Sequence, residues 1–76
     1  MADRRKEWIN TDINIDDIPL SDILKTTIQE AEDYAAIGDY EYFGVAEILD
    51  VLCKNRYAIG LMTEEQWDRI CMRYHT

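Results

Sequence analysis

The chain has 76 residues, of which 47% are hydrophobic, and its 16 acidic and 8 basic residues give a formal net charge of -8. A chain this short forms one domain with a thin core, because it buries only roughly 60 to 65% of the surface that the unfolded chain exposes. The aromatic and branched residues exclude a disordered acidic tail. The negative charge disfavours direct binding to nucleic acid or to an anionic membrane.

Residues 1–20 are expected to form an N-terminal arm, either extended or with a short helix. The stretch "RRKEWI" can start such a helix, with Trp8 and Ile9 as its packing anchor. Pro19 restricts the residue before it to an extended conformation. The basic start is not followed by the apolar segment of a signal peptide or a membrane span, and two cysteines are too few for a disulfide framework. We therefore expect a cytoplasmic protein with reduced thiols.

Three helices are predicted, over residues 21–37, 39–55 and 63–74. Ser21 is a good N-cap for the first helix, and Gly38 suits the left-handed position after its end. The second helix is apolar on almost every side, which is typical of a central helix. Thr63 and Gln66 form a capping box at the start of the third helix. The predicted fold class is all-α: a small three-helix bundle with the arm laid across it.

The sequence has no complete motif for a metal site or for catalysis. Residues 12–23 match the first three ligand positions of an EF-hand loop, but they lack its glycine and its closing glutamate. Cys53, Cys71 and His75 are too few and too scattered for a structural zinc site. A single histidine, no glycine-rich phosphate loop and a thin core argue against an enzyme. We expect no catalytic residue, no metal and no cofactor.

Negative charge is concentrated in the middle of the chain, where residues 7–53 contain twelve acidic residues and one base, Lys25. The stretch "QEAEDYAAIGDYEYFG", residues 29–44, combines five carboxylates with three tyrosines and a phenylalanine. Because self-repulsion of this kind destabilises a small domain, we expect a function that offsets it. Carboxylates next to aromatic rings can imitate phosphates and bases in a cationic groove. The candidate partner-binding residues are Glu30, Glu32, Asp33, Asp39, Tyr40 and Glu41, together with Asp16 and Asp17 of the arm.

In size, charge and helical content, the chain resembles small phage-encoded inhibitors of host nucleic-acid machinery, anti-CRISPR proteins and DNA mimics among them. The acids from Asp12 to Asp50 and the neighbouring tyrosines carry this resemblance. It implies a non-enzymatic inhibitor in the host cytoplasm that blocks the basic nucleic-acid-binding site of a partner, for example a nuclease or a CRISPR effector. Those proteins share no sequence signature or fold, so no functional residue is carried over from them.

Two other interpretations remain open. An acidic antitoxin that neutralises a basic toxin would rely on the same electrostatics. A helical assembly protein would instead form a homodimer through apolar residues of the second and third helices and the connection between them, with the acids serving solubility only. The residues expected in that dimer interface are Ile48, Val51, Tyr57 and Met72.

Overall fold

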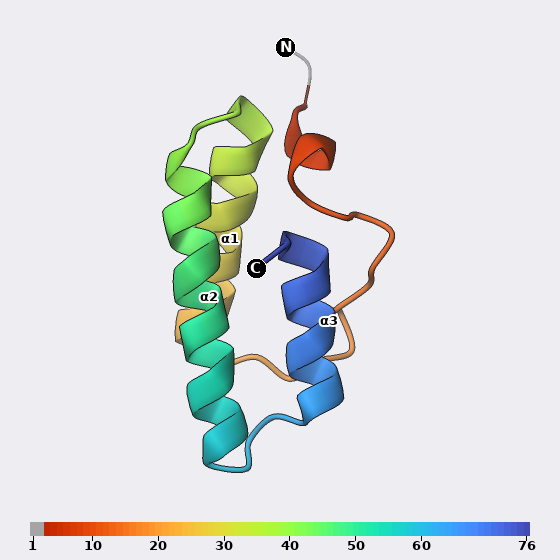
Figure 1. The fold of residues 1–76 in the computed structure, drawn as a ribbon, viewed down its shortest axis with the longest axis vertical. Coiled ribbons are helices and arrows are strands. Elements are labelled where there is room, and N and C mark those ends of the chain that lie inside the picture. Colours follow the sequence, from red (N-terminus) through yellow and green to blue (C-terminus); the bar gives the residue numbers. More distant parts are fainter. Residues whose placement is uncertain (1–2) are drawn as a thin grey trace.

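The computed structural model describes residues 3–76 and shows three α-helices preceded by a mostly irregular arm (Figure 1). The elements are the 3-10 helix η1 (Arg5–Glu7) and the α-helices α1 (Asp22–Ile37), α2 (Glu41–Ala58) and α3 (Glu64–Tyr74). Residues 3–76 contain no strand, and the predicted all-α three-helix bundle with a short helical arm is confirmed. Residues 1 and 2 of the expected arm lie outside the described residues. The molecule is elongated, with extents of 40 × 22 × 18 Å.

Both ends of α1 and the start of α3 lie where their capping residues predict. The Ser21 hydroxyl accepts a hydrogen bond from the amide of Leu24 (3.3 Å). Gly38 follows α1 in the left-handed conformation, with φ of 69°, which a glycine adopts at little cost. Thr63 and Gln66 form the reciprocal capping box at the start of α3. Local side-chain chemistry therefore sets these boundaries.

Helix α2 differs from its prediction at both ends. It begins at Glu41 rather than at Asp39, and the Tyr40 side chain provides no capping hydrogen bond. The Asp39 carboxylate instead accepts a hydrogen bond from the amide of Glu41 (2.9 Å), which closes a tight turn. The helix continues beyond the expected end at Asn55 to Ala58, because an aromatic ring of its last turn packs on α3. Tertiary packing extends the helix further than the sequence pattern indicated.

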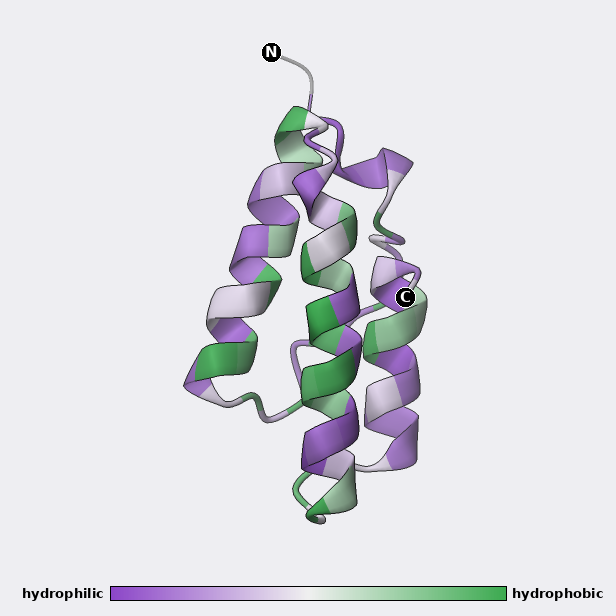
Figure 2. Ribbon diagram, turned by 60° about the vertical axis from the view of Figure 1, so that its left-hand side comes forward, coloured by the Kyte–Doolittle hydropathy of each residue, from purple (hydrophilic) through white to green (hydrophobic). Residues whose placement is uncertain are grey.

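The central position predicted for α2 is observed, since it packs against both α1 and α3 and is the middle helix in Figure 2. The arm runs beside α3 and returns to the start of α1 (Figure 1), and it buries Ile9, Ile15 and Ile18 in the core. Ile48 and Val51 on α2 stay more than half exposed. None of the helices within residues 3–76 combines the length and the apolar character needed to cross a bilayer.

Tyr42 connects α2 to the arm and to the end of α3. Its side chain is 1% exposed, and its hydroxyl donates to the carbonyl oxygen of Tyr74 (2.7 Å) and lies 3.3 Å from that of Trp8. Burial, with the Glu32 carboxylate adding to it, raises the pKa of Tyr42 to about 12. Burial likewise raises the pKa of the Cys53 thiol to about 11. Ionisation of either group therefore opposes folding.

Stability should fall at alkaline pH, because the folded protein retains protons that the unfolded chain releases. The pKa of Tyr42 rises from 10.0 to about 12 on folding. The stability that the protonated Tyr42 hydroxyl contributes is therefore fully present below pH 10 and is lost as the pH rises towards 12. We expect Tyr42→Phe to lower the free energy of unfolding at neutral pH by about 1 kcal/mol through its lost hydrogen bond. The same variant should lose stability less steeply above pH 10, by roughly 1.4 kcal/mol per pH unit.

Urea unfolding of the wild-type protein and of Tyr42→Phe at several pH values between the two pKa values measures this difference. Parallel pH profiles for the two proteins would show that the hydroxyl is not protected by folding.

Candidate functional site

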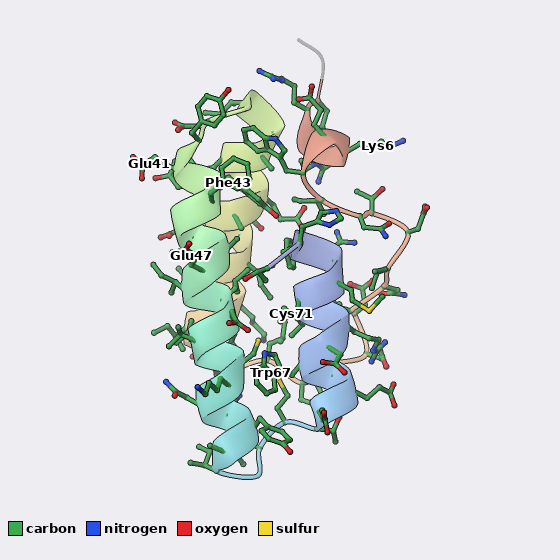
Figure 3. All side chains as sticks on the ribbon, in the orientation of Figure 1. Lys6, Glu41, Phe43, Glu47, Trp67 and Cys71 are labelled. Atoms are coloured by element: carbon green, nitrogen blue, oxygen red, sulfur yellow. The ribbon has the colours of Figure 1, made fainter. Side chains whose placement is uncertain are left out.

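Five of the candidate partner-binding residues lie on α1 and on the turn that joins it to α2. They form what we call the acidic turn surface: Glu30, Asp33, Asp39, Tyr40 and Glu41. Glu30 and Asp33 are exposed on α1, and Asp39 is partly exposed in the turn. The exposed side chain of Glu41 points away from the other helices (Figure 3). The reversal at Gly38 places the acids of the turn next to the end of α1.

Tyr40 is the most exposed of the large apolar side chains in the described chain, at 78%. Its ring centroid lies 5.7 Å from that of Trp8 and 6.2 Å from that of Phe43. The Trp8 and Phe43 rings are 4.9 Å apart, and Phe43 is itself 47% exposed. Aromatic pairs at these distances are favourable beyond their buried area. Tyr40 is therefore supported by two other rings while most of its surface faces solvent.

Arg4 lies at the edge of this surface. Its guanidinium occupies the space that a Cβ atom on Gly38 would need. The Nε atom of Arg4 donates to the Glu7 carboxylate (2.6 Å), and this hydrogen bond raises the pKa of Arg4. A guanidinium group therefore already rests against the turn, next to the aromatic rings.

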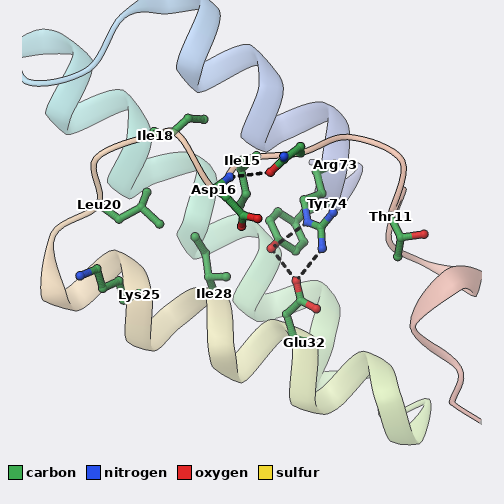
Figure 4. Close-up of a pocket in the computed structure, with 11 residues that line it drawn as sticks. Thr11, Ile15, Asp16, Ile18, Leu20, Lys25, Ile28, Glu32, Arg73 and Tyr74 are labelled. Atoms are coloured by element: carbon green, nitrogen blue, oxygen red, sulfur yellow. Dashed lines mark hydrogen bonds and ion pairs between the residues drawn. The ribbon is translucent and has the colours of Figure 1, made fainter.

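The structure corrects the expected place of Glu32, which does not flank the exposed edge. Its side chain is 15% exposed, and one carboxylate oxygen accepts hydrogen bonds from the Tyr74 hydroxyl (2.7 Å) and from Arg73 (3.2 Å) (Figure 4). The other oxygen lies 3.4 Å from Arg5. Arg73 also donates to the carbonyl oxygen of Ile13 (2.7 Å). This carboxylate is used to hold the arm and α3 on α1, so it is not free for a partner.

Asp16 and Asp17 lie on the arm, away from the acidic turn surface: Asp17 contacts Arg69 of α3, and Asp16 lines a cavity together with Lys25 near the start of α1. Both oxygens of Asp17 accept hydrogen bonds from Arg69 (3.0 and 2.9 Å), and these bonds lower the pKa of Asp17. Asp16 lines a cavity of about 570 Å³ between the arm, α1 and α3 (Figure 4). The eight candidate residues therefore do not form one continuous patch.

Trp8, Phe43 and Arg4 belong to the site although the sequence did not single them out for it. Phe43 stood beside the predicted acids in "DYEYFG", so its neighbours were a usable signal. Trp8 and Arg4 contact the turn from the arm, although they are far from it in the sequence, and no local sequence pattern indicates such a contact. Their role depends on how the arm is placed.

The cysteines take part in packing. Cys53 is fully buried, and the Cys71 thiol donates to the Asp50 carboxylate (3.3 Å). Burial raises the pKa of Cys71 to about 12. The Trp67 indole donates to the same Asp50 oxygen (3.0 Å), which ties α2 to α3. Within residues 3–76, no three side chains of the ligand types His, Cys, Asp and Glu come together to hold a metal ion.

No protein-family model, curated protein or solved structure matches this chain.

Glu32→Gln should lower the free energy of unfolding by about 2 kcal/mol, because it leaves Arg73 and Arg5 facing a neutral amide. Asp33→Asn is the matched control: it removes the same charge from the next residue of α1, at an exposed position. We expect the control to change stability by less than about 0.5 kcal/mol. Urea unfolding at neutral pH measures both, and equal losses would contradict the structural role of Glu32.

Proposed function

We propose that this protein is a non-enzymatic binding protein. Its acidic turn surface occupies a basic, nucleic-acid-binding site of a partner protein and thereby excludes DNA or RNA. A nuclease or a CRISPR effector in the host cytoplasm fits this description of the partner. The observation that carries the proposal is Tyr40: an aromatic ring 78% exposed, supported by two other rings and placed between Asp39 and Glu41.

An aromatic ring in this setting suits a partner rich in arginine and lysine. The face of a tyrosine ring attracts guanidinium and ammonium groups, and this attraction grows when the pair is removed from water. Tyrosine is also among the residues that dominate binding energy at the centre of protein interfaces. Because Trp8 and Phe43 already hold the ring, little side-chain entropy is lost when a partner binds.

The distribution of ion pairs supports the same choice of surface. Arg69 and Arg73 neutralise Asp17 and Glu32, on the side of the molecule that the arm covers. Glu30, Asp33 and Glu41 remain exposed on α1 and α2. Their negative charge raises the rate of encounter with a cationic groove in a salt-dependent way.

Reversing two of these charges should weaken the interaction without unfolding the domain. We expect Asp33→Lys/Glu41→Lys to lower affinity for the partner by roughly tenfold or more at low salt, and to flatten the salt dependence. Tyr40→Ala should also lower affinity but leave the salt dependence steep, because it removes a ring and no charge. The partner is first captured on the immobilised protein from a nuclease-rich lysate at low salt, and released at high salt.

The matched control is Glu64→Lys/Asp68→Lys, which makes the same change in net charge at two exposed positions of α3. Binding of each variant to the purified partner, and displacement of a labelled DNA from that partner, give the readouts. The proposal requires the control to bind like the wild-type protein. Equal losses of affinity in the two double variants would show that only the net charge of the protein matters. An unchanged affinity of Asp33→Lys/Glu41→Lys would reject the acidic turn surface as the binding site.

A further inference from the structure

One face of α2 is apolar and open to solvent. Ile48 and Val51 lie near the middle of the helix and are 53% and 54% exposed. Together with Gly44, Glu47 and Leu52 they line a shallow groove of about 270 Å³ along the helix. Figure 2 shows hydrophobic residues along these central turns of α2, and no other segment passes in front of them in that view. Apolar side chains at the centre of a small protein's middle helix are normally covered.

Gly44 is the second sign that something approaches this face. It lies inside α2, where glycine stabilises a helix less than alanine does. A Cβ atom at this position would find open space, because, apart from the adjoining backbone of α2 and the two neighbouring residues, no described atom lies within 4 Å of it. Packing within the chain therefore gives no reason for a glycine here. The close approach of a backbone from another chain would explain the glycine, because a residue without a side chain leaves room for it. Ala58, two heptads further on, puts a second small residue on the same stripe of the helix.

The charges on this face are complementary to those of a second, antiparallel copy of the same face. Glu47 and Lys54 are both exposed. Because they are seven residues apart, they lie along the same edge of the apolar stripe. Along the helix axis, Glu47 precedes Val51 and Lys54 follows it. When two such helices run antiparallel and cross near Val51, each Glu47 comes opposite a Lys54 of the other helix. The mismatch along the axis is only about 1.5 Å, the rise of one residue. The same register brings Gly44 opposite Ala58.

We propose that α2 is the interface of a homodimer, in which two copies pair their α2 helices antiparallel around a two-fold axis near Val51. The interface consists of Ile48 and Val51 at its centre, Glu47 and Lys54 as cross-chain ion pairs, and Gly44 and Ala58 where the backbones approach. It shares no residue with the acidic turn surface and does not depend on the function proposed for that surface.

Self-complementary charge favours a second copy over other occupants of this face. A cationic partner would meet Lys54 within the apolar stripe, and an anionic partner would meet Glu47. Only a chain with the opposite order of charges matches both, and an antiparallel copy of α2 has that order. Tyr57 and Met72, the other residues expected in a dimer interface, are not part of this stripe. Tyr57 packs on Trp67 of α3, with ring centroids 5.4 Å apart, and Met72 belongs to α3 itself.

Charge reversal with rescue tests the pairing. Glu47→Lys and Lys54→Glu each place like charges opposite one another, and each should raise the dimer dissociation constant by roughly tenfold or more. The double variant Glu47→Lys/Lys54→Glu restores the complementary order and should dimerise as the wild-type protein does. Sedimentation equilibrium at micromolar concentration gives the dissociation constants. A wild-type protein that stays monomeric, or a double variant no better than the single ones, overturns the proposal.

Disulfide trapping tests the register independently. Val51→Cys places a thiol near the two-fold axis, where oxidation should link the two copies covalently. Met72→Cys is the matched control, since that side chain is 62% exposed but lies on α3. We expect efficient cross-linking of Val51→Cys, and none beyond the wild-type level for Met72→Cys. Trapping through position 72 and not through position 51 would place the interface on α3 and reject the α2 pairing.

Discussion

The hydrogen bonds and ion pairs of the Glu32 carboxylate are the constraint that places the arm and the end of α3 against α1. The carboxylate receives Arg5 from the arm and Arg73 and Tyr74 from α3, so it joins two segments from opposite ends of the chain to α1. With the arm held on that side, the Tyr40 side chain and the outer face of α2 remain exposed. The two surfaces that we propose for binding are therefore a consequence of where the arm is held.

Elements governed by local chemistry could be predicted from the sequence. Ser21, Gly38 and the capping box at Thr63 act over four residues or fewer, and the boundaries that they set are close to those observed. The start of α2 was missed, because the Asp39 carboxylate can serve either as a helix cap or as a turn acceptor, and the sequence does not decide between them. Its extension to Ala58 reflects packing on α3.

The candidate site was predictable only in part, because charge in a sequence does not reveal which charges will meet. The bases at both ends of the chain looked remote from the acids in its middle. Folding brings Arg5 and Arg73 to Glu32, and Arg69 to Asp17, so these acids are compensated while Glu30 and Glu41 stay exposed. The aromatic support of Tyr40 by Trp8 was hidden for the same reason, since it depends on where the arm lies. Repulsion in the folded protein is therefore smaller than the sequence suggested.

The order in which the chain is made gives the Glu32 cluster a further consequence. A ribosome synthesises the arm first, and Arg73 and Tyr74 only after the rest of α1, α2 and α3. Tyr74 supplies the hydroxyl that binds Glu32 and the carbonyl that binds Tyr42. During translation, α1 and α2 can pair while the arm still lacks its partners on α3. The arm can therefore close fully only after the end of α3 has been made, because until then it lacks the hydrogen bonds that Arg73 forms with Ile13 and Asn10.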